Sequence, residues 1–301
     1  MKRLILNLLL LVTIFLAVFP DAAIADASQH ESSISEGRFE KGLLWEITRP
    51  GRASSYVFGT MHSEDPRVMT LPPSVQTSFD GSRSLTLEIL PGPELRAASK
   101  MMFFTDEHTL ASVAGERLYQ EVVSAMAEYG LPDGIIVKMK PWAVFTMLSV
   151  PKPKSGIFLD MSLYRMALQN KMQTLALESV QEQLGIFDTL PMKEQVILMK
   201  KSLQDRHAIS EQINTLTEAY LARDLKQLQE IGEKFAPRDD PIAKRLMQRL
   251  IDDRNLTMVK RMQPQLEEGG AFIAIGALHL PGRHGILALL AEKGYRVRVV
   301  Y

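Results

Sequence analysis

Residues 55–62 read Ser-Tyr-Val-Phe-Gly-Thr-Met-His, a short β-forming apolar run that ends in a glycine and a histidine. Such a run predicts a buried strand, and a glycine at its end lets the backbone turn or approach another group closely. The same pattern recurs near the other end of the chain, where Phe272–Ile275 precedes Gly276 and His279. Because ligands of open α/β sheets bind outside the carboxyl ends of strands, the two Gly-x-x-His motifs predict that His62 and His279 meet at one site.

Other apolar runs of strand length lie at both ends of the chain and once in its middle. Leu43–Ile47 and Tyr56–Phe58 flank turn residues 49–52 and predict a β-hairpin. Helical patterns fill approximately residues 94–150 and 180–266. The other predicted strands are Ser84–Leu90, Gln173–Glu178, Phe272–Ile275 and Tyr295–Val300. We therefore predict an α/β fold, with a mixed β-sheet core built from both ends of the chain and a large, mostly helical insertion.

The first 25 residues have the pattern of a signal peptide. Lys2 and Arg3 precede an apolar stretch shorter than the roughly 20 residues of a membrane-spanning helix, and Ala23–Ala25 supplies a cleavage site. Residues 26–41 are polar and are predicted to form a flexible leader. We expect an exported protein, periplasmic or secreted, without stable membrane insertion after cleavage. The chain has no cysteine, which excludes disulfides and a lipid-modified cysteine.

The net charge argues against nucleic acid as a partner. The chain has 35 basic and 35 acidic residues, and removal of residues 1–25 takes away two basic and one acidic residue, which leaves 33 against 34. A near-neutral protein offers no electrostatic attraction for a polyanion or an anionic membrane.

Two of the predicted strands also place a glutamate at or near their carboxyl ends. Leu85–Glu88 and Leu175–Glu178 both read Leu-x-Leu-Glu. A carboxylate in such a place is costly unless it is paired, hydrogen-bonded or bound to a cation. Two histidines and two glutamates at strand ends indicate a site for a divalent metal such as Mn, Co, Fe or Zn.

A helix predicted from Pro241 to about Leu266, with Asp240 as its N-cap, adds two candidates. Arg254 lies on the apolar stripe of this helix, and Asn255 lies beside it. An inward guanidinium meets a carboxylate or steadies an oxyanion of a substrate. A purely structural ion pair is the alternative for Arg254.

The order of these motifs resembles the TraB/PrgY/GumN family over nearly the whole mature chain. The resemblance begins at Gly42–His62 and ends with Arg254-Asn255, Phe272–Gly282 and Gly294–Val297. The middle of the chain is similar to the family at Lys140–Trp142, at Leu159-Asp160 and at Leu177–Ser179 with Gln183-Leu184. Residues 42–301 are thus identified as a domain of the TraB/GumN type.

The resemblance implies metal-dependent peptide hydrolysis, because the family is related to the Tiki metalloproteases. In those proteins, two Gly-x-x-His motifs and a strand-end glutamate carry the reaction, which implies metal ligands at His62, His279 and Glu88. Many relatives have a second acid two residues after this glutamate, whereas this chain has Leu90.

Three functional hypotheses follow from these residues. The first is a metal-dependent hydrolase of peptides or proteins, with Mn, Co or Zn as cofactor, Glu178 as general base or extra ligand, and Arg254 and Asn255 in the catalytic group. The second is a periplasmic protein that binds or sequesters a peptide without cutting it, which the missing second acid favours. The third is a structural factor whose histidines only organise the sheet.

Overall fold

The computed structural model describes residues 38–152, 154–234 and 239–301, which form two compact units. The helical unit comprises residues 91–156 and 180–214, and the sheet unit comprises residues 38–90, 157–179 and 215–301. The predicted signal peptide and most of the predicted leader lie outside the described residues. At the end of the leader, Phe39 is buried against Trp45, with ring centroids 5.4 Å apart. Within the described ranges, no helix is both long and apolar enough to cross a membrane.

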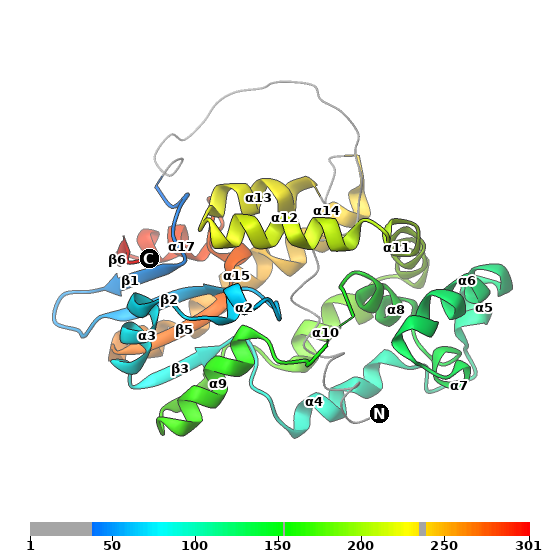
Figure 1. The fold of residues 1–301 in the computed structure, drawn as a ribbon, viewed down its shortest axis with the longest axis horizontal. Helices are drawn as coiled ribbons and strands as arrows, with labels where there is room; N and C mark the ends of the chain where they lie inside the picture. Colours follow the sequence, from blue (N-terminus) through cyan, green and yellow to red (C-terminus); the bar gives the residue numbers. More distant parts are fainter. Residues whose placement is uncertain (1–37, 153, 235–238) are drawn as a thin grey trace. The chain divides into compact units, whose positions relative to one another are not determined.

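The sheet unit contains one six-stranded mixed sheet, which confirms the predicted fold class (Figure 1). The strand order is β4-β3-β5-β2-β1-β6. The four strands from β4 to β2 run parallel to one another, whereas β1 runs antiparallel to β2 and to β6. The strands are β1 (Leu44–Thr48), β2 (Ser55–Thr60), β3 (Ser84–Leu87), β4 (Gln173–Ala176), β5 (Ala271–Gly276) and β6 (Arg296–Val299).

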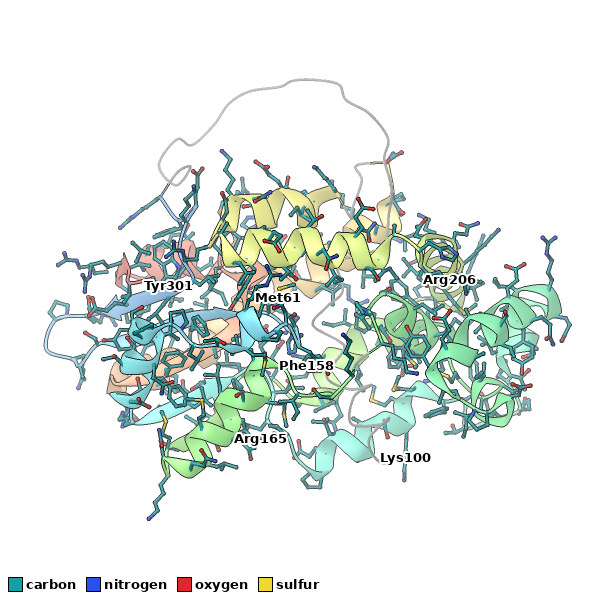
Figure 2. The ribbon with its side chains drawn as sticks, in the orientation of Figure 1. Met61, Lys100, Phe158, Arg165, Arg206 and Tyr301 are labelled. Atoms are coloured by element: carbon teal, nitrogen blue, oxygen red, sulfur yellow. The ribbon has the colours of Figure 1, made fainter. Side chains whose placement is uncertain are left out.

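The hairpin and the strands from both ends of the chain are confirmed. β1 pairs with β2 as an antiparallel hairpin, and β5 lies beside β2 although more than 200 residues separate them in sequence. Phe272 of β5 is fully buried, and its ring lies 5.8 Å from that of Phe58 and 5.2 Å from that of Phe79. Burial of one such side chain contributes about 1.5–3 kcal/mol. The Arg223 guanidinium lies over the ring of Tyr301 (labelled in Figure 2), 4.7 Å from its centroid.

Helices of the sheet unit cover the sheet and connect its strands. α9 contacts β3 and β4, and α17 contacts β6 and α15. The bounds are α2 (Pro66–Met69), α3 (Pro73–Asp80), α9 (Leu159–Gln169), α13 (Leu225–Lys234), α14 (Pro241–Leu250), α15 (Asp252–Arg261), α16 (Gln263–Glu268), η4 (Ala277–His279) and α17 (Ile286–Glu292). The helix α12 (Ile209–Leu221) begins in the helical unit and ends in the sheet unit.

The prediction of one helix from Pro241 to about Leu266 is wrong. The structure has three helices in this segment, α14, α15 and α16. The first break is at Ile251, which separates α14 from α15 and has φ −115° and ψ −70°. The second precedes α16, where a proline without an N–H occupies the first turn. The predicted cap is confirmed, since Asp240 Oδ1 accepts hydrogen bonds from the backbone N–H groups of Ile242 and Ala243 at 3.1 and 3.0 Å.

The helical unit has its own core. Trp142 is fully buried and stacks on Phe187, with ring centroids 5.9 Å apart. The Trp142 indole N–H and the Lys140 ammonium both donate to Asp188 Oδ1, at 2.8 and 2.6 Å. These residues therefore stabilise the unit. Its elements are α4 (Pro93–Ala98), η2 (Ser99–Met102), α5 (Leu110–Ala114), α6 (Glu116–Met126), η3 (Ala127–Tyr129), α7 (Asp133–Ile136), α8 (Pro141–Leu148), α10 (Val180–Asp188) and α11 (Met192–Asp205).

Candidate functional site

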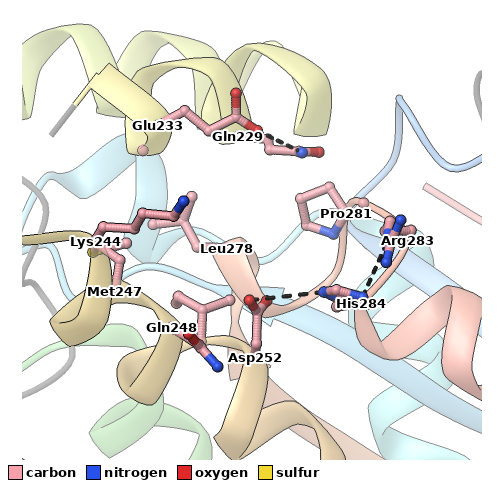
Figure 3. A pocket seen from close by; sticks show the side chains of 14 residues that line it. Gln229, Glu233, Lys244, Met247, Gln248, Asp252, Leu278, Pro281, Arg283 and His284 are labelled. Atoms are coloured by element: carbon pink, nitrogen blue, oxygen red, sulfur yellow. Dashed lines mark hydrogen bonds and ion pairs between the residues drawn. The ribbon is translucent and has the colours of Figure 1, made fainter. Parts of the chain in front are cut away.

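A cavity of about 580 Å³ lies beside the loop that follows the second Gly-x-x-His motif (Figure 3). Helices α13 and α14, the start of α15 and the loop residues 278–285 form its walls. Leu278 and Pro281 supply apolar surface, and Lys244 and His284 supply polar groups. His284 Nδ1 lies 3.7 Å from Asp252 Oδ2 at the cavity wall. The cavity thus shares a loop with the buried polar cluster that contains His279.

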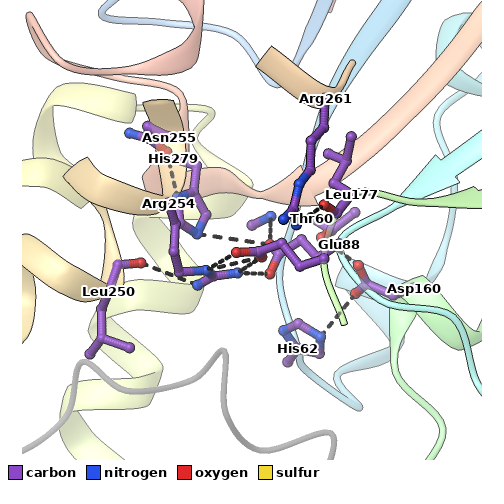
Figure 4. Close-up of polar contacts among 12 residues, drawn as sticks. Thr60, His62, Glu88, Asp160, Leu177, Leu250, Arg254, Asn255, Arg261 and His279 are labelled. Atoms are coloured by element: carbon purple, nitrogen blue, oxygen red, sulfur yellow. Dashed lines mark hydrogen bonds and ion pairs between the residues drawn. The ribbon is translucent and has the colours of Figure 1, made fainter. Parts of the chain in front are cut away.

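The parallel strands bring the predicted histidines and glutamates to one edge of the sheet (Figure 4). Glu178 follows β4, Glu88 follows β3, His279 follows β5 and His62 follows β2. The two glutamates are also adjacent in the backbone, because the N–H of Glu178 donates to the carbonyl of Glu88 at 2.8 Å. The parallel pairing of β4, β3, β5 and β2 is therefore what gathers side chains that are far apart in sequence.

Arg254 joins the two glutamates. Its Nε donates to both carboxylate oxygens of Glu178, at 3.1 and 3.0 Å, and its Nη2 donates to Glu178 Oε2 at 2.7 Å and to Glu88 Oε2. Its Nη1 donates to the carbonyl of Leu250 at 3.2 Å. The guanidinium is buried, so the apolar stripe correctly predicted an inward arginine. A buried guanidinium between two carboxylates is a strong ion pair that fixes the positions of both acids.

Burial and charge set the ionisation of this group. Burial acts to raise the pKa of Glu88, but the charge of Arg254, the imidazole of His279 and the N–H of Gly276 outweigh it and lower this pKa to about 2. Burial acts to lower the pKa of Arg254, and the charges of Glu88 and Glu178 raise it above its ordinary value. Glu88 is therefore a carboxylate, and Arg254 a cation, throughout the neutral pH range.

Asn255 fixes the orientation and the tautomer of His279. The Asn255 amide Nδ2 donates to the backbone carbonyl of His284 at 2.8 Å, so its Oδ1 is the acceptor that faces His279 Nδ1 at 2.6 Å. The Nδ1 atom therefore carries the hydrogen, and the lone pair of the neutral ring is on Nε2. Burial, and then the charge of Arg254, lower the pKa of His279 to about 3, so the ring is neutral at pH 7.

This arrangement leaves two acceptors face to face. His279 Nε2 lies 3.9 Å from Glu88 Oε1, and both atoms are buried. A lone pair opposite a carboxylate oxygen is repulsive in a site of low dielectric constant. A cation between the two atoms would remove the repulsion, since neutral imidazole and carboxylate are both ligands for divalent metals.

The second histidine has a partner that the sequence did not predict as a site residue. His62 Nε2 lies 3.5 Å from Asp160 Oδ2, and Thr60 donates its hydroxyl to Asp160 Oδ1 at 2.8 Å. The ring of Phe158, labelled in Figure 2, stands edge-on to His62 with centroids 6.0 Å apart. The signal in the sequence was the pair Leu159-Asp160, where an acid stands between apolar residues at the start of a helix.

Of the remaining described histidines, His108 and His207 belong to the helical unit and His284 to the sheet unit. The side chains of His108 and His284 are 53% and 51% exposed, and His207 is also exposed. His284 reaches the cluster only through its backbone carbonyl, which Asn255 uses.

The glycines of the two motifs allow close approach. A Cβ on Gly276 would lie 3.2 Å from Glu88 Oε1 and 3.5 Å from His279 Cδ2. The backbone N–H of Gly276 donates to that same Glu88 oxygen at 2.7 Å. The glycine thus lets the main chain serve as a hydrogen-bond donor to the carboxylate.

The donor chemistry of the cluster fits a divalent metal, although its atoms are not gathered into a ready-made coordination sphere. Among the described residues, no three His, Asp or Glu side chains are already arranged to hold a metal ion. The cluster instead has two pairs, each of an imidazole nitrogen and a carboxylate oxygen, 3.5 and 3.9 Å apart. Asp160 Oδ2 is buried and has no hydrogen-bond partner within the described part of the chain, as expected of a ligand atom.

Comparisons with known proteins identify the family of the chain. The family model of the TraB/PrgY/gumN family matches residues 43–299. The chain is similar to Metalloprotease TIKI1 of Danio rerio, with 23% identity over 309 aligned positions that cover 85% of this chain. The chain spans 62% of the length of that relative. No solved structure matches the chain.

Proposed function

Because the chain belongs to the TraB/PrgY/gumN family, we propose that it is a metal-dependent hydrolase that cleaves a peptide or protein at the strand-end cluster. The observation that carries the proposal is the pair of facing acceptors, His279 Nε2 and Glu88 Oε1, at 3.9 Å. The similarity to a protein named as a metalloprotease supports the choice of reaction.

The residues proposed to hold the metal are His62, His279 and Glu88, with Mn, Co or Zn as the candidate ion. Such an ion would polarise the scissile carbonyl and lower the pKa of a bound water. Neutral imidazole is the form that binds a metal, and Asn255 holds His279 in it with Nε2 available.

Arg254 and Glu178 act beside the ligands in this proposal. Arg254 holds the carboxylates of Glu88 and Glu178 in place, so Glu88 presents Oε1 toward His279. Glu178 is the candidate to accept a proton from the attacking water, because it lies beside the proposed ligand Glu88. Its backbone N–H donates to the carbonyl of Glu88, and its carboxylate accepts from Arg254. A substrate oxyanion near Arg254 would be stabilised by the same guanidinium.

Peptide hydrolysis with and without histidine variants tests the proposal. We expect cleavage of a peptide library in the presence of Mn²⁺ or Co²⁺, and a loss of more than ~100-fold for His62→Ala and for His279→Ala, since loss of a ligand exceeds the effect of its supporting groups. His108→Ala is the matched control, because His108 also pairs with an aspartate, Asp106, but lies in the helical unit. Activity that survives both site variants would contradict the mechanism.

The same experiment separates hydrolysis from peptide capture. Calorimetric binding of a peptide that stays intact and needs no metal would favour a binding or sequestering protein. Residues 1–25 support export, so we propose that the protein works in the periplasm or outside the cell.

A further inference from the structure

Asp160 has a buried carboxylate oxygen that the packing of the sheet unit does not explain. The residue is 9% exposed and lies in the first turn of α9. Thr60 donates to its Oδ1 at 2.8 Å, which fixes the direction of Oδ2. Oδ2 has no hydrogen-bond partner among the described residues. An acceptor left unsatisfied in the interior costs about 1–3 kcal/mol, and more when it is charged.

Asp160 is one of three buried carboxylates in the cluster. The buried carboxylates of the cluster are those of Glu88, Glu178 and Asp160, and Arg254 is the guanidinium that pairs with the first two. The carboxylate of Asp160 instead faces the imidazole of His62.

The distance between His62 and Asp160 suits a shared ion better than a hydrogen bond. Their Nε2 and Oδ2 atoms are 3.5 Å apart, beyond the usual range of an N–H···O bond. Ligands bind zinc at about 2.0–2.2 Å, so two ligands of one tetrahedral ion lie about 3.4 Å apart. The pair therefore has the separation of neighbouring ligands, and the hydroxyl of Thr60 stands in the position of a group that orients a ligating carboxylate.

We propose that Asp160, through Oδ2, is a ligand of the divalent cation beside His62, Glu88 and His279. This inference rests on the proposed function and extends it by one residue. Two imidazole nitrogens and two carboxylates make a mixed N and O ligand set, which suits Zn, Co or Mn. Thr60 is then the positioning residue for this ligand.

Titration of the full mature chain with Co²⁺ after treatment with a chelator tests the inference. We expect Asp160→Asn to raise the Kd for Co²⁺ by ~10-fold or more, because a neutral amide is a poorer ligand than a carboxylate. The metal-free variant should unfold at a temperature equal to or above that of the wild type, because the amide removes the unsatisfied charge. Asp252→Asn is the matched control: Asp252 also faces a histidine, His284 at 3.7 Å, but lines the cavity and should bind Co²⁺ like the wild type.

The outcomes distinguish this inference from the proposed function. Wild-type Kd for Asp160→Asn, together with weak binding by His62→Ala, would overturn the role of Asp160 and leave the metal site standing. Absence of Co²⁺ binding by the wild type would overturn the metal-dependent function itself. If Asp160→Asn does not fold, Thr60→Val tests the role of Asp160 instead. This variant keeps the carboxylate of Asp160 but removes the hydrogen bond that Thr60 donates to its Oδ1. A Kd raised severalfold is expected, and an unchanged Kd contradicts the inference.

Discussion

Single side chains of the cluster make stability depend on pH. His279 is neutral in the folded protein because burial and then Arg254 lower its pKa from 6.5 to about 3. The unfolded chain therefore binds a proton at this ring between pH 6.5 and pH 3 that the folded chain does not bind. The contribution of the neutral ring to stability is complete above pH 6.5 and is lost as the pH falls toward 3.

We expect the free energy of unfolding of the chelator-treated protein to decrease by up to ~1.4 kcal/mol per pH unit below pH 6.5 through this one group. His279→Gln removes the titrating ring and should make the decrease shallower. Urea denaturation of both proteins at several pH values between 7 and 4.5 measures the two slopes. Identical slopes would show that the ring does not titrate on unfolding in this range.

The sequence predicted some residues of the cluster and not others for a physical reason. Arg254 was predicted because helical periodicity placed a charged residue on an apolar stripe, and the structure shows its guanidinium buried between two glutamates. Asp160 was missed as a site residue because its partner Thr60 is 100 residues away and belongs to another element. A long-range pair leaves no periodic trace in the sequence.

At the scale of elements, the two Gly-x-x-His motifs contact each other directly. β2 and β5 are parallel neighbours, and Thr60 is opposite Gly276 in the register. A Cβ on Gly59 would lie 2.8 Å from Leu280 Cδ1 and 3.1 Å from the Cα of Ala277. The absence of a side chain at Gly59 thus makes room for Ala277 and Leu280, which follow Gly276 of the second motif.

We expect Gly59→Ala to destabilise the protein by about 1–3 kcal/mol, because the methyl group overpacks a buried contact. Gly185→Ala in α10 is the matched control, because its Cβ would meet nothing within 4 Å and alanine favours a helix. Thermal unfolding of both variants checks this. Equal stability of Gly59→Ala and wild type would mean that Leu280 moves aside without cost.

The elements that the sequence predicted best are those with a strong local pattern. The hairpin strands and β5 fall within one or two residues of their predicted bounds, because apolar runs and turn residues specify them locally. The breaks at Ile251 and before α16 were missed, because the apolar stripe continues through both. The second break coincides with the proline in the first turn of α16, which has no N–H to continue the hydrogen bonds of the preceding helix.

At the scale of the whole molecule, both ends of the chain build the sheet, and the middle supplies most of the helical unit. Arg254 connects three distant parts of the sheet unit, because it binds the residues after β3 and β4 from a helix near the C-terminus. The architecture was predictable from the positions of the strands. The central role of one guanidinium depends on the folded geometry.

We expect Arg254→Met to destabilise the protein by about 3–5 kcal/mol, because it leaves Glu88 and Glu178 buried without their cation. Lys260→Met on the exposed side of the same helix is the matched control and should change stability by less than ~0.5 kcal/mol. Urea denaturation at pH 7 measures both. A small effect of Arg254→Met would mean that the two acids take up protons or a metal in its place.

Asn255 donates its hydrogen bond to the backbone carbonyl of His284, which leaves the side chain at position 284 open to substitution. Every amino acid has a backbone carbonyl, so the hydrogen bond that holds Asn255 against His279 does not depend on the side chain at position 284. That side chain, with its neighbour Arg283, is exposed and lines the cavity. Mutation of residues 283 and 284 can therefore change the cavity wall to fit a different ligand, while the imidazole of His279, five residues earlier in the chain, keeps its orientation.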